Sequence, residues 1–284
     1  MTLRIQSHKD LQFVLVGAQK TSTFWLAACI RSHPDIFISS ETTFLTHETH
    51  KTYSFWQNYF STLGDEAIVG EYANSYLAHP KVPEMLARAN PNLKIIVSTR
   101  NPLEQTVSAY HHDLKFGVLG RHVRLRSALG KDMFFTRYVE MASYSRLLKC
   151  WLQYFPASQI YLFSNSRDSL VRQERLDDLF SFLDASPHRP YCLDEKLNVR
   201  TFPLFPSWFR NSISCPNRLI HVLAWWTNFI NLSLGKLCAT TTIVEEDREA
   251  VLRAFRSVQE REKLEELVSS ESFRGRIAFE DWSL

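Results

Sequence analysis

The chain has 284 residues, enough to bury a sizeable core, and its 45% hydrophobic content with 20 Phe, 10 Tyr and 7 Trp excludes a disordered protein. Its formal net charge of +3 argues against a nucleic-acid-binding protein, which would carry a larger basic excess. The five cysteines are odd in number and widely spaced, which favours reduced thiols over a disulfide framework or a zinc site.

The stretch from Val14 to Leu26, VLVGAQKTSTFWL, predicts a buried strand, a tight turn and the start of a helix. The apolar run stops at Gly17, and the next residues carry Lys20 and three hydroxyl side chains. A helix N-terminus directs backbone N–H groups and the positive end of the helix dipole to one point. The segment therefore predicts a site for phosphate or sulfate, although a plain strand-to-helix connection with an exposed lysine would give the same pattern.

The segment GAQKTSTFWL is similar to the 5′-phosphosulfate loop, GxxKxGTTWL, of sulfotransferases that use 3′-phosphoadenosine 5′-phosphosulfate (PAPS). The P-loop of nucleoside triphosphatases is excluded, because it needs a glycine directly before the lysine. Ser22 stands where the family pattern has its second glycine. In this resemblance Lys20 would stabilise developing charge, and Trp25 would line an adenine pocket or pack in the core. The implied donor-binding residues are Gln19, Lys20, Thr21, Ser22, Thr23, Phe24 and Trp25.

A second short strand is predicted over 36–39, followed by SETTFLTH. Ligands of parallel sheets bind beyond the carboxyl ends of the strands, so we expect Glu41 in the same crevice as Lys20. A carboxylate beside an anion site suits a general base, and a solvated loop carboxylate is the alternative. SETTFL resembles the KEPHFF-like stretch of heparan-type sulfotransferases, which implies that Glu41 is the catalytic base.

The segment AIVGEYANSYL, residues 67–77, predicts a third short strand and then a loop. It resembles the EKTPSYF segment of the same family, with Tyr72 in place of the lysine and Asn74 in place of the proline. The resemblance makes Glu71 and Ser75 weak candidates for acceptor binding. The alternative is that they cap and orient the loop.

The next predicted strand, 93–99, leads into a helix with Asn101 as N-cap and a proline at its first position. Arg100 therefore leaves the strand at a helix mouth, where its planar guanidinium could bind phosphate oxygens, and Ser108 lies on the same helix. The block resembles the 3′-phosphate motif RNPxxRxxSxY, with Gln105 in place of the second arginine. The resemblance implies that Arg100 and Ser108 bind the 3′-phosphate. A surface ion pair beside a helix serine is the alternative.

The remaining segments predict structure more than chemistry. Residues 115–131 are basic and hold three of the eight glycines, which predicts a mobile loop. The basic glycine loop that often closes over the cofactor in this family is not recognisable, and its nearest stand-ins are Lys196, Asn198 and Arg200. Residues 216–237 predict an apolar helix near the acceptor, packed against the core rather than touching a membrane through 219–234. Residues 244–268 predict two charged helices.

The N-terminus has no apolar stretch typical of a signal peptide, so we expect a cytoplasmic protein. His47 and His50 have no supporting ligand pattern, and we expect no metal. The interpretation is one α/β domain over residues 1–284, with a parallel sheet flanked by helices and a P-loop-like sulfotransferase fold. The sequence leaves the oligomeric state open.

The resemblance implies a PAPS-dependent sulfotransferase that acts on a hydroxyl or amine. A small natural product, such as a polar alkaloid toxin of the saxitoxin type, is the expected acceptor, with adenosine 3′,5′-bisphosphate as the second product. A glycolipid or polysaccharide is the alternative acceptor. The alternatives of another class are a nucleotide-dependent kinase, which would need magnesium ligands, and a non-catalytic nucleotide-binding protein.

Overall fold

In the computed structural model the described residues are 5–120, 122–166, 168–195, 243–279 and 282. A six-stranded sheet in the order β2-β3-β1-β4-β5-β6 forms the centre, and its paired strands run parallel. The strands are β1 (Phe13–Gly17), β2 (Ile36–Glu41), β3 (Ile68–Tyr72), β4 (Lys94–Thr99), β5 (Ile160–Ser164) and β6 (Arg274–Arg276). The predicted parallel α/β fold is confirmed. β1, which carries the phosphosulfate-like loop, lies between β3 and β4.

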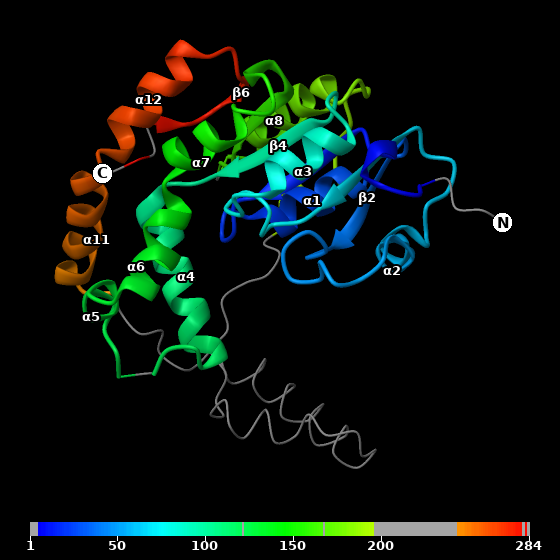
Figure 1. Cartoon of the computed structure of the whole chain (residues 1–284). Helices are drawn as coiled ribbons and strands as arrows, with labels where there is room; N and C mark the ends of the chain where they lie inside the picture. The colour runs from blue at the N-terminus through cyan, green and yellow to red at the C-terminus, as the bar shows by residue number, and fades with distance from the viewer. Residues whose placement is uncertain (1–4, 121, 167, 196–242, 280–281, 283–284) are drawn as a thin grey trace.

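Helices cover both faces of this sheet (Figure 1). One face packs against α1 and α8 through a cluster that includes Leu26, Ile96 and Phe180. The other face packs against α2, α3, α7 and α12 through a cluster that includes Trp56, Leu86 and Trp151. The helices are α1 (Thr23–Arg31), α2 (Tyr53–Trp56), α3 (Val82–Ala89), α7 (Tyr144–Trp151), α8 (Ser169–Phe182) and α12 (Glu260–Ser270). Short 3₁₀ turns are η1 (His8–Asp10), η2 (Gln57–Phe60), η3 (Glu140–Ala142) and η4 (Ala157–Gln159).

A separate group of helices gathers beside the sheet in Figure 1 and has its own apolar cluster, which includes Tyr110, Phe134 and Phe255. The group consists of α4 (Pro102–Phe116), α5 (Leu125–Leu129), α6 (Asp132–Tyr138) and α11 (Glu245–Val258). Because α4 starts directly after β4, this group is attached at the carboxyl end of the sheet. It therefore forms one wall beside the predicted anion site.

Several element boundaries differ from the prediction. β2 extends to Glu41, so the expected loop carboxylate is the last residue of a strand. The loop predicted over 115–131 is wrong for 125–129, which form α5, because Leu125 and Ala128 are buried in the helical cluster. β6 was not predicted, since its three residues, RGR, have no apolar pattern. The predicted helix over 216–237, the alternative of a membrane contact over 219–234 and the stand-ins at 196, 198 and 200 lie outside the described residues.

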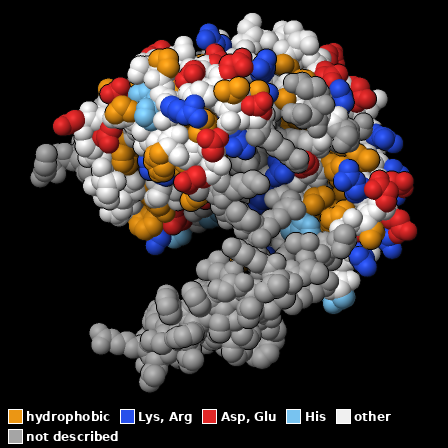
Figure 2. All heavy atoms as spheres, turned by 180° about the vertical axis from the view of Figure 1, so that it is seen from behind, with side chains coloured by type: hydrophobic (Ala, Val, Ile, Leu, Met, Phe, Trp, Pro, Cys, Tyr) orange, Lys and Arg blue, Asp and Glu red, His pale blue; other side chains and the backbone are white. Residues whose placement is uncertain are grey.

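Acidic and basic side chains are interspersed over the face of the molecule seen in Figure 2. This distribution agrees with the small net charge of +3. Among the helices in the described ranges, none has the length and apolar character that crossing a bilayer requires.

Candidate active site

The loop between β1 and α1 has an unusual backbone. Gly17, Lys20 and Ser22 take positive φ angles of 129°, 66° and 69°, and Ser22 is the N-cap of α1. When successive residues alternate between right-handed and left-handed backbone conformations, their N–H groups point into one concavity. The first turn of a helix adds further N–H groups that have no intrahelical acceptor. The loop therefore has the donors and the dipole that a phosphosulfate group requires.

Side chains from β4 and α4 hold this loop in place. The backbone N–H of Ala18 donates to the carbonyl of Ser98 at 3.0 Å, and the Ser98 hydroxyl donates to the carbonyl of Thr21 at 2.8 Å. The amide of Gln105 donates to the carbonyl of Gln19 at 2.9 Å. The loop conformation is thus set by the two elements that carry the second predicted phosphate motif.

Arg100 lies beside the loop, as the two-motif hypothesis requires. Its guanidinium donates to the carbonyl of Lys20 at 3.4 Å and to the carboxylate of Glu104 at 2.9 Å. Asn101 caps α4, since its side chain accepts from the N–H of Leu103. Glu104 and Ser108 are four residues apart on α4 and so share a face, where Ser108 is partly exposed.

Glu41 is the last residue of β2 and its side chain is exposed. Partial burial raises the pKa of its carboxyl group, whereas a hydrogen bond with Tyr72, the positive charge of Lys20 and a hydrogen bond with Asn74 lower it. Partial burial in turn lowers the pKa of the Lys20 ammonium group, and the charge of Glu41 opposes this effect. The predicted base and the predicted loop lysine therefore lie within electrostatic reach of each other.

Two residues of this cluster were missed by the sequence reasoning. The Tyr72 hydroxyl lies 3.1 Å from the Thr23 hydroxyl, and the Asn74 carboxamide accepts a hydrogen bond from Gln19 at 3.5 Å. Both residues are departures from the family segment, which has lysine and proline at these positions. The alternation of side chains along a strand could have found Tyr72, because it must face away from Glu71.

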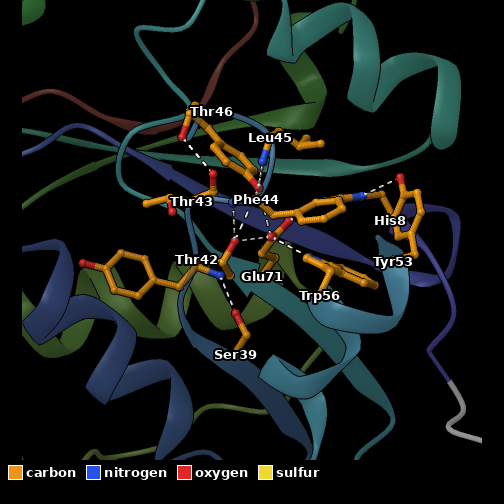
Figure 3. A network of polar contacts seen from close by, with 12 residues as sticks. His8, Ser39, Thr42, Thr43, Phe44, Leu45, Thr46, Tyr53, Trp56 and Glu71 are labelled. Carbon is orange, nitrogen blue, oxygen red and sulfur yellow. Dashed lines mark hydrogen bonds and ion pairs between the residues drawn. The ribbon is translucent and has the colours of Figure 1, made fainter. Parts of the chain in front are cut away.

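Glu71 is fully buried on the opposite face of the sheet, inside the network in Figure 3. Its carboxylate accepts hydrogen bonds from His8 Nε2 at 2.9 Å, Thr42 Oγ1 at 2.8 Å, Trp56 Nε1 at 2.8 Å and Tyr76 Oη at 3.1 Å. One of these donors, Thr42, directly follows Glu41 in the chain.

Ser75 lies on the loop after β3 and is partly exposed. Its hydroxyl contacts the Thr46 hydroxyl at 3.0 Å, in the segment that follows β2. Ser75 therefore joins the loop after β3 to the segment that leads away from Glu41.

The two aromatic residues of the phosphosulfate-like loop differ in exposure. Phe24 is 50% exposed, whereas Trp25 is 5% exposed. The Trp25 indole donates to the carbonyl of Cys192 at 3.0 Å, and the guanidinium of Arg172 lies over its ring at 5.2 Å. Trp25 thus packs between α1, α8 and the segment that follows α8.

A small hollow next to the loop contains an arginine that sequence reasoning also missed. Arg137 of α6 makes a two-point ion pair with Asp113, at 2.6 and 2.7 Å, and Asp113 also accepts from the Tyr138 hydroxyl at 2.8 Å. Burial would raise the pKa of Asp113, but its hydrogen-bonded neighbours, among them His112 and Arg137, lower it to about 2. The residues that line the hollow are Gln19, Lys20, Gln105, Ala109, Arg137, Tyr138 and Met141.

No group of three or more His, Cys, Asp or Glu side chains able to hold a metal ion occurs in the part of the chain that the structure describes. His47 and His50 lie in the segment between β2 and α2.

Comparison with known proteins assigns the family. A protein-family model described as a sulfotransferase domain matches residues 10–190, a range that includes Lys20, Glu41 and Arg100. The chain belongs to the sulfotransferase family.

Among curated proteins, this chain is similar to heparan sulfate glucosamine 3-O-sulfotransferase 6 of Homo sapiens, with 28% identity over 160 residues, covering 55% of this chain and 47% of that protein. It is also similar to the membrane-associated sulfotransferase kil1 of Dictyostelium discoideum, with 23% identity over 118 residues, covering 37% of this chain and 23% of that protein. The chain thus spans about half the length, or less, of these relatives.

Among solved structures, a sulfotransferase from Alicyclobacillus acidocaldarius superimposes with a TM-score of 0.56 and 18% identity, covering 80% of this chain and 96% of that one. At that identity the likeness concerns the fold alone.

Proposed function

We propose that this chain is a PAPS-dependent sulfotransferase that transfers a sulfuryl group to a hydroxyl or amine of its acceptor. The observation that supports this most is the 3.4 Å contact between the Arg100 guanidinium and the Lys20 carbonyl. The contact joins the two segments that we propose to bind anions, 80 residues apart in sequence. A donor with phosphate groups at the 5′ and 3′ positions of one adenosine needs two such sites.

Each residue then has a separate task. When bound, PAPS supplies an electrophilic sulfur joined to a phosphate leaving group. Lys20 and the N–H groups of the loop stabilise negative charge on the bridging oxygen. Arg100 and Ser108 hold the 3′-phosphate, and a planar guanidinium suits that role because it binds phosphate at two points.

Glu41 takes the proton from the acceptor. Its pKa, raised by partial burial, makes it a better proton acceptor than a freely solvated carboxylate, while the charge of Lys20 keeps the ionised form accessible.

The first acceptor class that we propose is a small polar natural product, for which a cationic alkaloid of the saxitoxin type is one candidate. The exposed carboxylate of Glu41 favours a cationic group beside it. Glu71 does not add to this argument, because it is fully buried. The second candidate is a sugar hydroxyl, which the names of the heparan sulfate glucosamine 3-O-sulfotransferases favour.

The test is transfer of ³⁵S from labelled PAPS to a panel of phenols, alkaloids and glycosaminoglycan fragments, with and without EDTA. We expect a labelled product, no effect of EDTA, and a loss of about 100-fold in turnover for Glu41→Gln with unchanged binding of adenosine 3′,5′-bisphosphate. The matched control is Glu84→Gln, on the exposed face of α3, which should turn over like the wild type.

Three results would contradict the proposal. Phosphoryl transfer from ATP that EDTA abolishes would indicate a kinase. Tight binding of the bisphosphate without transfer to any acceptor of the panel would indicate a non-catalytic binding protein. Full activity of Glu41→Gln would remove Glu41 from its role as base.

A further inference from the structure

Tyr72 is the last residue of β3 and lies next to Glu41 in the register of β2 and β3. Its backbone holds the residues on both sides of Glu41. The N–H of Tyr72 donates to the Ser39 hydroxyl at 3.1 Å, and the carbonyl of Tyr72 accepts from the N–H of Thr42 at 2.8 Å. The end of β2 is therefore fixed to the backbone of Tyr72, independently of the Tyr72 side chain.

The side chain of Tyr72 points to the α1 face of the sheet and is 2% exposed. Its hydroxyl lies 3.1 Å from the Thr23 hydroxyl. Glu41 is the partner of Tyr72 in the register of β2 and β3, and each of the two side chains shifts the pKa of the other. Burial raises the pKa of Tyr72 to about 12. The phenol therefore keeps its proton near neutral pH and is available as a hydrogen-bond donor to the Glu41 carboxylate. The Thr23 hydroxyl in turn donates to the phenol oxygen, which lowers the pKa of Tyr72 slightly against the effect of burial.

Tyr72 therefore lies between Thr23, whose hydroxyl its own hydroxyl contacts, and Glu41, its neighbour on β2. Thr23 is the first residue of α1 and belongs to the phosphosulfate-like loop. Glu41 is the base of the proposed function. Tyr72 thus connects the element that would bind the donor to the group that would deprotonate the acceptor.

We propose that Tyr72 is a positioning residue for this sulfotransferase: its hydroxyl orients the carboxylate of Glu41 and ties it to the donor loop through Thr23. The inference rests on the proposed function, in which Glu41 is the base. It also gives a reason for the tyrosine at a position where the resembling family segment has a lysine. A lysine there would supply a positive charge, whereas this chain supplies a neutral donor and leaves Lys20 as the charged group that acts on Glu41.

The interaction with the Tyr72 hydroxyl also lowers the pKa of Glu41. It stabilises the ionised form of Glu41 and so opposes the effect of burial. Without the phenol oxygen, only Lys20 and Asn74 remain to lower the pKa of Glu41. Removal of that oxygen must therefore raise the pH at which Glu41 becomes protonated.

The experiment is a pH titration of the full chain labelled with ¹³C at the glutamate carboxyl carbons. The difference between the wild type and Glu41→Gln identifies the Glu41 resonance. We expect Tyr72→Phe to move its midpoint to higher pH. Tyr161→Phe, which removes a buried hydroxyl of β5 that binds Asp178 and the carbonyl of Arg175, should leave the midpoint unchanged. An unchanged midpoint in folded Tyr72→Phe would overturn the inference.

A second measurement needs no substitution at Tyr72 and covers the case in which that variant does not fold. In wild-type protein labelled at the tyrosine Cζ carbons, one tyrosine resonance should shift over the pH range in which Glu41 titrates, and this shift should be absent in Glu41→Gln. If every tyrosine resonance that moves in the wild type also moves in Glu41→Gln, Tyr72 does not bond to Glu41.

Turnover separates this inference from the proposed function on which it rests. In the sulfuryl-transfer assay we expect kcat of Tyr72→Phe to fall about tenfold with an unchanged Kd for adenosine 3′,5′-bisphosphate. If Glu41→Gln loses activity and Tyr72→Phe keeps the wild-type rate and midpoint, the positioning role fails and the proposed function stands. If Glu41→Gln keeps full activity, the proposed function fails even where the midpoint shifts.

Discussion

Ser22 takes a φ angle of 69° at the N-cap of α1, a backbone conformation that glycine adopts at lower cost. The same position is the one where this chain departs from the glycine of the phosphosulfate loop pattern. With serine in place of glycine, the loop keeps the left-handed conformation at this position, and the backbone of Ser22 is strained. The hydrogen bonds from Ser98 and Gln105 to neighbouring carbonyls help to hold that shape.

Replacement of Ser22 by glycine should relieve this strain. A left-handed conformation costs a residue with a side chain about 1–2 kcal/mol, and the greater freedom of glycine in the unfolded chain takes back about 0.5–1 kcal/mol. We expect Ser22→Gly to raise the free energy of unfolding by about 0.5 kcal/mol. Urea denaturation measures it, with Ser127→Gly in α5 as a control that should lower stability. A clear loss of stability in Ser22→Gly would show that its side chain contributes more than its backbone costs.

At the scale of elements, the network around Glu71 connects the 3₁₀ turn η1, the segment after β2, helix α2 and strand β3 (Figure 3). Burial alone would raise the pKa of Glu71, but the charge of His8 and the hydrogen bonds from His8, Trp56 and Thr42 outweigh it, so the pKa is lowered. Because the pKa is lowered on folding, the ionised carboxylate stabilises the protein at neutral pH. That contribution is lost as the pH falls through the lowered folded-state pKa.

Glu71→Gln should accordingly be strongly destabilising at pH 7. The amide places a donor among four donors, and each buried donor left without an acceptor costs about 1–3 kcal/mol. The matched control is Glu84→Gln, whose ion pair with Arg88 is exposed and is worth less than about 1 kcal/mol. Thermal unfolding at pH 7 compares the two variants. A small and equal loss of stability in both would show that the network does not stabilise these elements.

The parallel sheet, its first four strands along the chain and the cap of α4 could be predicted because each rests on a local pattern, such as an apolar run or an Asn-Pro pair. Lys20, Glu41 and Arg100 could be placed in one crevice because they follow strands of a parallel sheet. Strand alternation could place Tyr72 on the face opposite Glu71, but its partner Thr23 depends on which helix covers that face. Arg137 could not be predicted, because its role depends on how α6 packs against α4. β6 could not either, since it is a three-residue edge strand.

Gln105 shows how a substitution can be interpreted only in three dimensions. The sequence presented it as a missing arginine of the 3′-phosphate motif. In the structure its amide donates to the carbonyl of Gln19, and its carbonyl oxygen accepts from the Tyr144 hydroxyl at 2.5 Å. The residue therefore joins α4 and α7 to the donor loop. The spacing of the motif gave no sign that the nitrogen and the oxygen of the Gln105 amide both bind other parts of the protein.

On the scale of the whole molecule, the account depends on how the sheet and the helical group meet. β4 lies directly beside β1, and α4 begins where β4 ends, so the strand order places the segment proposed to bind the 3′-phosphate against the segment proposed to bind the 5′-phosphosulfate. The proposed donor differs from other adenine nucleotides by its 3′-phosphate, which is the group that Arg100 and Ser108 would bind.

The measurement that tests this most directly is calorimetry of adenosine 3′,5′-bisphosphate against adenosine 5′-phosphate, with the wild type, Arg100→Ala and the exposed-surface control Arg88→Ala. A charge-assisted contact contributes about 1.5–3 kcal/mol, so we expect the bisphosphate to bind the wild type and the control at least about 10-fold more tightly. In Arg100→Ala this preference should largely disappear. Equal affinity of the wild type for both nucleotides would contradict the assignment of Arg100 and Ser108, and with it the proposed donor.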